Sequence, residues 1–191
     1  MKIIFATHNQ NKVEELKQIV PSKYSLLSLN DIGCIKEIKE TGSTLEENAQ
    51  IKADYVRYKY GLDCFSDDSG LEIDALGGAP GVYSARYAGD QKNNDANIEK
   101  IWKELKGIRN PKAIFRSVIY VHLNKKKICF QGKVEGSIIY EKRGLEGFGY
   151  DPIFIPKGYK KTFAELGDTT KNKISHRALA IVQLVKLLER T

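Results

Sequence analysis

The sequence near the start reads KIIFATHNQNKVEELKQIV over residues 2–20, and it combines an apolar run, a polar turn and an apolar stripe of helical spacing. Residues 2–6 are almost entirely apolar, which predicts a short buried strand. Val13 and Leu16 begin a stripe that recurs at the spacing of one helix face, and Pro21 marks the end of that helix. The opening therefore predicts a strand, a polar turn and a helix.

Further helices are predicted from local signals. Residues 44–47 read TLEE, which has the form of a capping box, so we expect a helix over residues 44–60 that stops at Gly61. An apolar stripe predicts another helix over residues 95–106, and a last one is expected from Ser175 to the end of the chain.

The remaining apolar segments predict strands. Residues 64–66 are a short strand candidate that leads into two aspartates, and the glycine-rich residues 77–81 predict a loop. Residues 114–123 and 128–134 alternate and are joined by a polar turn, which predicts a β-hairpin. Strands that alternate with helices before a meander predict an α/β protein with a mixed sheet.

The composition is typical of one folded domain, which we expect to span residues 1–191. Hydrophobic residues make up 41% and charged residues 29% of the chain, enough for one well-buried core without a second domain. The formal net charge of +7 indicates an anionic partner. A nucleotide, a nucleic acid and an anionic surface fit that charge equally well.

Three cysteines, Cys34, Cys64 and Cys129, stand far apart and form no C-x-x-C pair. This spacing argues against a zinc site and against a disulfide framework. The sequence also contains neither a signal-peptide pattern nor an apolar run near the roughly 18 residues that a membrane span needs. We therefore expect a cytoplasmic protein with no membrane association.

The polar turn between the first strand and the first helix is the first candidate site. Backbone amides at a helix N-terminus, the helix dipole, polar side chains and a lysine could all face an anion there. The turn lacks the glycines of a Walker loop or a dinucleotide fingerprint, so an ordinary polar surface turn is the alternative. Its residues are Thr7, His8, Asn9, Gln10, Asn11 and Lys12.

The second candidate site is the pair of aspartates, Asp67 and Asp68, followed by Ser69 and Gly70. Adjacent carboxylates at a strand end can hold a hard divalent cation and accept a proton from water. Mg²⁺ keeps several waters, so one or two carboxylates with substrate phosphates suffice for a site. The alternative is an Asx turn that only caps the following amides.

Two further segments carry candidate site residues. Residues 147–152 read GFGYDP, a loop able to stack a base and accept its hydrogen bonds, or else an ordinary tight turn with core aromatics. Residues 171–177 read KNKISHR and place His176 and Arg177 in the first turn of the last helix. Cations there oppose the helix dipole, so we expect an anionic or electronegative group beside them.

With these segments identified, the chain resembles the inosine triphosphate pyrophosphatase family from end to end. The resemblance rests on five motifs in the family order: THNQNK, ETGSTLEENAQIKA, SDDSGLEIDALGGAPGVYSARYAG, EGFGYDPIF and KNKISHRA. It implies a two-lobed α/β fold, with a long curved mixed β-sheet flanked by helices and a nucleotide cleft between the lobes. It also implies a homodimer. The SARYAG segment, residues 84–89, could line the cleft or lie at the dimer interface, and we expect it at the interface.

The resemblance also implies a role for each matching residue. The turn from Thr7 to Lys12 would hold the triphosphate with Lys52, and Ser69 would contact substrate. Asp68 would be both a magnesium ligand and the proton acceptor, with Glu40 as a second carboxylate near the Mg²⁺. The base pocket would be lined by Phe148, Gly149, Tyr150, Asp151, Lys171, His176 and Arg177.

The implied reaction is hydrolysis of ITP, dITP and XTP to the monophosphate and pyrophosphate, with water activated by Asp68 attacking the α-phosphorus. Donors from Arg177, His176 or loop amides would select the 6-oxo group of the base. A pyrophosphatase of similar fold acting on modified pyrimidine or methylated nucleotides is one alternative, although KNKISHR favours purines. A nucleic-acid-binding module is another, but no recognised motif accompanies the lysines at 125–127, so we expect no stable nucleic-acid partner. An inactive nucleotide sensor would lack Asp68, which is present.

Overall fold

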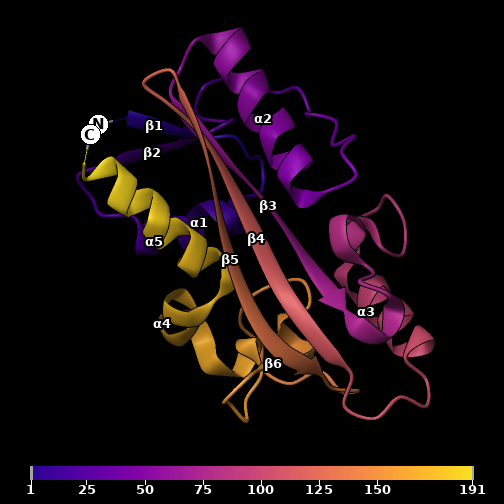
Figure 1. Ribbon diagram of the computed structural model, residues 1–191. Helices are drawn as coiled ribbons and strands as arrows, with labels where there is room; N and C mark the ends of the chain where they lie inside the picture. The colour runs from indigo at the N-terminus through magenta and orange to yellow at the C-terminus, as the bar shows by residue number, and fades with distance from the viewer. Residues whose placement is uncertain (1, 191) are drawn as a thin grey trace. The chain divides into compact units, whose positions relative to one another are not determined.

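A computed structural model describes residues 2–190, and a six-stranded sheet runs through it in the order β2-β1-β3-β4-β5-β6 (Figure 1). The strands are β1 (Lys2–Phe5), β2 (Ser25–Ser28), β3 (Cys64–Ile73), β4 (Lys112–Leu123), β5 (Lys126–Ile138) and β6 (Phe154–Pro156). The helices are α1 (Gln10–Ile19), α2 (Leu45–Tyr60), α3 (Asn94–Glu104), α4 (Phe163–Ile174) and α5 (His176–Leu188). Short 3₁₀ helices lie at Asp74–Leu76, Gly81–Arg86 and Asp151–Ile153.

The sheet is mixed, as the sequence predicts. Strand β1 pairs in parallel with β2 and with β3, whereas β5 and β6 pair antiparallel. Strands β4 and β5 are joined by a tight turn in which Asn124 and Lys125 have φ of 49° and 67°, the left-handed geometry of a hairpin turn. The predicted α/β class with helices flanking a mixed sheet is confirmed.

The chain divides into two compact units, each assembled from segments far apart in the sequence. The first unit takes in residues up to 68, residues 117–132 and residues from 177 onward. The second unit takes in residues 69–116 and 133–176. The predicted two lobes are therefore present, while the single-domain span and the cleft stay predictions.

In the first unit, successive residues of a strand meet different helices. Side chains alternate between the two faces of a strand, so Phe5 and Phe65 enter the core with α1 and α5 while Cys64 enters the core with α2. The Phe5 and Phe65 rings stack with centroids 4.7 Å apart. Because helices cover both faces, Ile3, Ile4 and Phe5 of β1 are all buried, as the apolar run at residues 2–6 indicates.

The second unit has a core of its own, in which a group of aromatic rings packs among aliphatic side chains. Phe115 of β4 packs edge-on against Phe154 of β6, with ring centroids 4.6 Å apart, and Phe163 of α4 completes the group. Helix α3 contributes Ile98 to the same core. No helix within residues 2–190 is long and apolar enough to cross a membrane.

The predicted helix starts follow from their caps. Asn9 is the N-cap of α1, and Thr44 and Glu47 form the predicted capping box at the start of α2. Gly61 ends α2 with φ of 69°, a left-handed conformation that glycine adopts without a Cβ clash.

One predicted strand differs from the structure, and three elements were not predicted. Strand β3 continues to Ile73, so the two aspartates lie inside a strand and neither at its end nor in an Asx turn. Elements β2, β6 and α4 were not predicted from the sequence. The two strands are only four and three residues long, too short to display an alternation, and α4 is interrupted at Gly167, which breaks its apolar period.

Candidate active site

The polar turn lies where the sequence places it, directly before α1. The Asn9 side chain accepts a hydrogen bond from the Lys12 amide at 3.3 Å, and Thr7 Oγ1 accepts one from the Asn9 amide at 3.1 Å. The ring nitrogens of His8 lie 2.9 Å from Asn30 Oδ1 and 3.1 Å from the Lys36 carbonyl oxygen. His8 therefore holds the turn in place.

Asp67 is the centre of a buried ionic network in the first unit. Its side chain, on the face that carries Phe65, accepts hydrogen bonds from Lys12 Nζ at 2.5 Å and Arg177 Nε at 3.0 Å. Arg177 also pairs with Glu15 of α1. Burial alone would raise the pKa of Asp67, but Lys12 and Arg177 outweigh it and hold that pKa well below its usual range.

Asp68 faces the opposite side of the strand and has a different electrostatic environment. Lys52 of α2 donates to Asp68 Oδ1 at 2.9 Å and to Glu40 Oε1 at 2.5 Å. Burial raises the pKa of Asp68, Lys52 opposes that rise and Glu40 adds to it, so the pKa ends above its ordinary value. Burial alone would lower the pKa of Lys52, but the two carboxylates outweigh it and raise that pKa.

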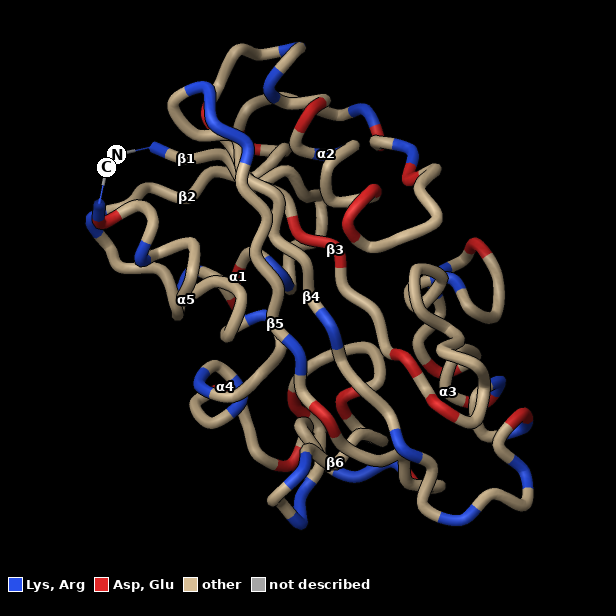
Figure 2. The backbone as a smooth tube through the Cα atoms, viewed as in Figure 1, with Lys and Arg blue, Asp and Glu red and all other residues tan. Residues whose placement is uncertain are grey.

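The alternation along β3 explains the contrast between the two aspartates. Cys64, Ser66 and Asp68 share the face covered by α2, where Cys64 Sγ and Ser66 Oγ donate to the backbone carbonyls of Ala53 and Ala49. Figure 2 shows acidic residues within β3. Their burial is possible because Asp67 and Asp68 each pair with a cation on their own face of the strand, Lys12 and Lys52 respectively. The cations beside Asp67 thus lower its pKa, while burial and Glu40 raise the pKa of Asp68.

The loop that carries Glu40 is fastened to the first turn of α2. The Gly42 amide donates to the fully buried Asn48 Oδ1 at 2.8 Å, and the Ser43 amide donates to Glu47 Oε2 at 2.6 Å. A Cβ on Gly42 would lie 2.6 Å from the Glu47 Cβ, so only glycine fits this close approach. Asn48, which lies one helical turn before Lys52, is not among the residues that the sequence pattern predicts for the site.

In the second unit, the GFGYDP loop is closed on itself by Asp151. Asp151 Oδ2 accepts hydrogen bonds from the Phe148 amide at 2.8 Å and from Lys171 Nζ at 2.8 Å. The Lys171 ammonium also lies 4.7 Å from the Phe148 ring centroid. Gly147 has φ of 79°, and a Cβ there would lie 2.3 Å from Asp151 Oδ2, so a side chain is excluded.

Tyr150 and His176 are buried in the same unit. The Tyr150 hydroxyl donates to the Ser84 carbonyl oxygen at 2.7 Å, and burial raises the pKa of Tyr150. The His176 ring stacks on Phe115, with centroids 4.6 Å apart and an interplanar angle of 6°. Stacking therefore orients the His176 ring, and the hydrogen bond to Ser84 orients the Tyr150 ring.

The predicted site residues fall into two sets. The first unit holds Thr7, His8, Asn9, Gln10, Asn11, Lys12, Glu40, Lys52, Asp68 and Arg177. The second unit holds Ser69, Phe148, Gly149, Tyr150, Asp151, Lys171 and His176. The residues expected to bind the phosphates and the metal thus lie in the first unit. The residues expected to bind the base lie in the second unit, except Arg177.

A family model described as the Ham1 family matches residues 3–187. The chain belongs to the Ham1 family. It is 55% identical over 190 residues to the dITP/XTP pyrophosphatase of Christiangramia forsetii, with 100% of each chain covered. It is 54% identical to the dITP/XTP pyrophosphatase of Bacillus subtilis, with 97% of this chain and 96% of the relative covered. These matches confirm the family predicted from the five motifs.

A solved Ham1 structure supports the fold assignment. The structure of a HAM1 protein from Coxiella burnetii superposes with a TM-score of 0.91 at 37% identity, covering 100% of both chains. The mixed sheet flanked by helices is therefore the fold of the Ham1 family.

The carboxylates of this Ham1 chain fit a magnesium ion in number and kind. Within residues 2–190, no group of three or more His, Cys, Asp or Glu side chains is arranged to hold a metal. Asp68 and Glu40 nevertheless converge on one ammonium group, that of Lys52. Two carboxylates suit Mg²⁺, which takes its remaining oxygen ligands from water and phosphate.

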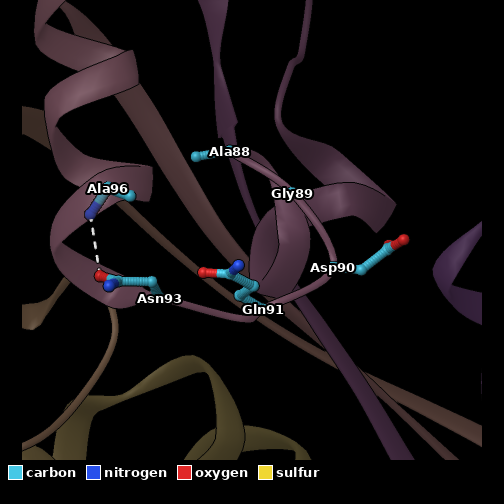
Figure 3. A pocket seen from close by; sticks show the side chains of 6 residues that line it. All are labelled: Ala88, Gly89, Asp90, Gln91, Asn93 and Ala96. Carbon is cyan, nitrogen blue, oxygen red and sulfur yellow. Dashed lines mark hydrogen bonds between the residues drawn. The ribbon is translucent and has the colours of Figure 1, made fainter.

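A separate hollow lies at the N-terminus of α3 in this Ham1 chain. Its volume is about 430 Å³, and Figure 3 shows the side chains around it. Asn93, the N-cap of α3, accepts a hydrogen bond from the Ala96 amide at 3.0 Å beside it. The lining residues are Ala88, Gly89, Asp90, Gln91, Asn93 and Ala96. The predicted site residues all lie within residues 2–190, and none of them lines this hollow.

Proposed function

We propose that this chain hydrolyses purine nucleoside triphosphates outside the standard four, namely ITP, dITP and XTP, to the monophosphate and pyrophosphate. Its class, a nucleoside-triphosphate pyrophosphatase, is confirmed by 55% and 54% identity over nearly the whole chain to proteins named dITP/XTP pyrophosphatase. The observation that carries the proposed mechanism is the pair of adjacent aspartates in β3: Asp67 contacts Lys12 and Arg177, whereas Asp68 shares the ammonium group of Lys52 with Glu40.

The triphosphate is assigned to cationic and amide groups of the first unit. The amides at the start of α1, with Lys12 and Lys52, supply positive charge for the phosphate oxygens. Asp67 holds the Lys12 ammonium at 2.5 Å and so orients it. Phosphoryl transfer depends mainly on positioning and charge neutralisation, which these groups provide.

Asp68 and Glu40 would hold Mg²⁺, the cofactor that this proposal requires. When bound, the ion neutralises charge on the phosphate oxygens. The loop anchored by Asn48 keeps the Glu40 carboxylate within reach of Lys52 and Asp68.

Asp68 is proposed as the proton acceptor for the attacking water. A general base works best when its pKa approaches the operating pH, and the surroundings of Asp68 move its pKa in that direction. The water oxygen bonds to the α-phosphorus, its proton passes to Asp68, and the bond to the bridging oxygen breaks with release of pyrophosphate.

The base is assigned mainly to the second unit. Phe148, held by Lys171 and Asp151, offers a ring for stacking, and Gly149 and Tyr150 belong to the same loop. Loop amides and His176 are proposed donors to the 6-oxo group. Arg177, whose guanidinium pairs with Asp67 and Glu15, is retained as a further proposed donor. Donors placed there would meet the 6-amino group of adenine unfavourably, and such mismatches can reject a substrate by about 10⁴.

The experiment is a comparison of pyrophosphate release from ITP, XTP, dITP, ATP and GTP in the presence of Mg²⁺. Turnover of the first three should far exceed that of ATP and GTP, and Asp68→Asn should abolish it. Asp63→Asn, which alters a partly exposed ion pair with Arg57, is the matched control and should retain activity. Release of orthophosphate, equal turnover of all five nucleotides, or full activity of Asp68→Asn would contradict the proposal.

The proposed assembly is a homodimer in the cytoplasm with no stable nucleic-acid partner. Sedimentation equilibrium would test the homodimer, because a monomer at micromolar concentration would contradict it. Titration with single-stranded RNA at about 0.15 M salt would test the last, since saturable binding there would overturn it.

A further inference from the structure

Helix α4 is two helical segments separated by one residue. Gly167 has φ of 72° and ψ of 166°, which no helix contains, so the segments are residues 163–166 and 168–174. The first segment has its own capping box, made by Thr162 and Glu165. The second segment starts after a glycine, which has no side-chain oxygen with which to cap it.

Glu146 supplies the oxygen that Gly167 lacks. Its Oε2 accepts a hydrogen bond from the Asp168 amide, the first of the second segment, at 3.1 Å. A Cβ on Gly167 would lie 2.9 Å from the same oxygen, so the glycine also makes room for the carboxylate. A carboxylate at this position also interacts favourably with the dipole of the segment.

Glu146 belongs to the loop that carries Phe148, and that loop contacts α4 at successive points. A Cβ on Gly144 would lie 2.3 Å from the Ala164 backbone, so the loop begins in close contact with the first segment. Glu146 then contacts the start of the second segment, and Asp151 binds Lys171 one turn further on. The Phe148 ring, which the Lys171 ammonium faces at 4.7 Å, therefore lies between two anchors.

We propose that Glu146 is a positioning residue that sets the base subsite by fixing the Phe148 loop to the second segment of α4. The assignment rests on the proposed function, because the base subsite is part of it. Asp151 anchors one end of the loop through Lys171, and Glu146 anchors the other. Loss of Glu146 should leave the chemistry unchanged and weaken binding of the base.

The test compares Glu146→Ala with Glu146→Gln, which keeps a capping oxygen, and with Glu165→Ala, which removes the corresponding cap from the first segment. For Glu146→Ala we expect KM for ITP to rise about tenfold, equivalent to about 1.4 kcal/mol and of the order of one lost helix cap, while kcat stays within about twofold. Glu146→Gln should restore most of the affinity, and Glu165→Ala should leave KM unchanged.

Amide hydrogen exchange gives a readout that does not depend on activity. The backbone amides of residues 146–151 and 168–171 should exchange faster in Glu146→Ala than in the wild-type protein. In Glu165→Ala, these amides should exchange at the wild-type rate. Unchanged exchange in Glu146→Ala, an equal KM rise in Glu165→Ala, or a fall in kcat alone would overturn the proposal. If the wild-type protein fails to hydrolyse ITP, the proposed function fails, and the exchange pattern still decides whether Glu146 anchors the loop.

Discussion

Replacing Asp67 with asparagine is expected to lower the free energy of unfolding by about 3–5 kcal/mol, because it removes the anion from a buried ionic network. Asp67 is 1% exposed and contacts Lys12 Nζ at 2.5 Å and Arg177 Nε at 3.0 Å. In the variant, Arg177 keeps Glu15 but Lys12 loses its carboxylate partner. With a typical urea dependence of about 2–3 kcal/mol per molar, the unfolding midpoint should fall by roughly 1–2.5 M.

The pH dependence of this difference has a definite sign. The folded-state pKa of Asp67 lies below its unfolded value of about 3.9, so its stabilising effect is complete above that pH and is lost as the pH falls toward the folded-state pKa. The gap in unfolding free energy between wild type and Asp67→Asn should stay constant from pH 7 to about pH 5 and narrow below about pH 4. Asp63→Asn, whose ion pair with Arg57 is partly exposed, should cost at most about 1 kcal/mol. A loss below about 1 kcal/mol in Asp67→Asn, or a gap that widens in acid, would refute the reasoning.

Three further predictions concern other parts of the chain. Asn48→Ala should cost about 1–3 kcal/mol in urea unfolding and weaken Mn²⁺ binding measured by electron paramagnetic resonance, because it releases the loop that carries Glu40; unchanged Mn²⁺ affinity would contradict this. Gly70→Ala places a Cβ 2.4 Å from a backbone carbonyl oxygen and should lower the unfolding free energy by roughly 1–3 kcal/mol, so wild-type stability would count against it. A thiol reagent at pH 8 should modify the exposed Cys129 first, and it should reach Cys64 only on unfolding, because burial raises the pKa of Cys64 to about 12. Mass spectrometry of the labelled peptides checks the order of modification, and labelling of Cys64 before Cys129 would contradict the prediction.

Local signals account for the elements that the sequence predicts correctly. The capping box at Thr44 and the left-handed Gly61 mark both ends of α2 within the helix sequence and its immediate neighbours. The interruption of α4 at Gly167 is the reverse case, because the oxygen that caps the second segment comes from Glu146, more than twenty residues away. The spacing of apolar residues, from which helices are predicted, does not indicate this contact between Glu146 and Asp168.

In the candidate site, the sequence likewise predicts which residue types are present, whereas only the fold shows which side chains surround them. The residue pattern identifies both aspartates without distinguishing them, and only the family resemblance singles out Asp68, because the cations beside each aspartate come from other parts of the chain. Lys12 lies 55 residues before Asp67, and Arg177 lies 110 residues after it. The expectation that the cations at the start of the last helix need an anionic neighbour agrees with the structure, in which Asp67 and Glu15 are the partners of Arg177.

The location of the two aspartates inside a strand has a consequence for how the chain can change in length. Adjacent residues of β3 face opposite helices, so deleting one residue between Cys64 and Asp67, with the rest of the strand held in register, would move Asp68 into the place of Asp67. Asp68 would then meet Arg177 and lose its affinity for a proton, although no residue of the site had been replaced. A loss or gain of one residue within β3 ahead of Asp67 would therefore place each carboxylate on the wrong face of the strand. We therefore expect related sequences to vary in length outside this segment and to keep its residue count constant.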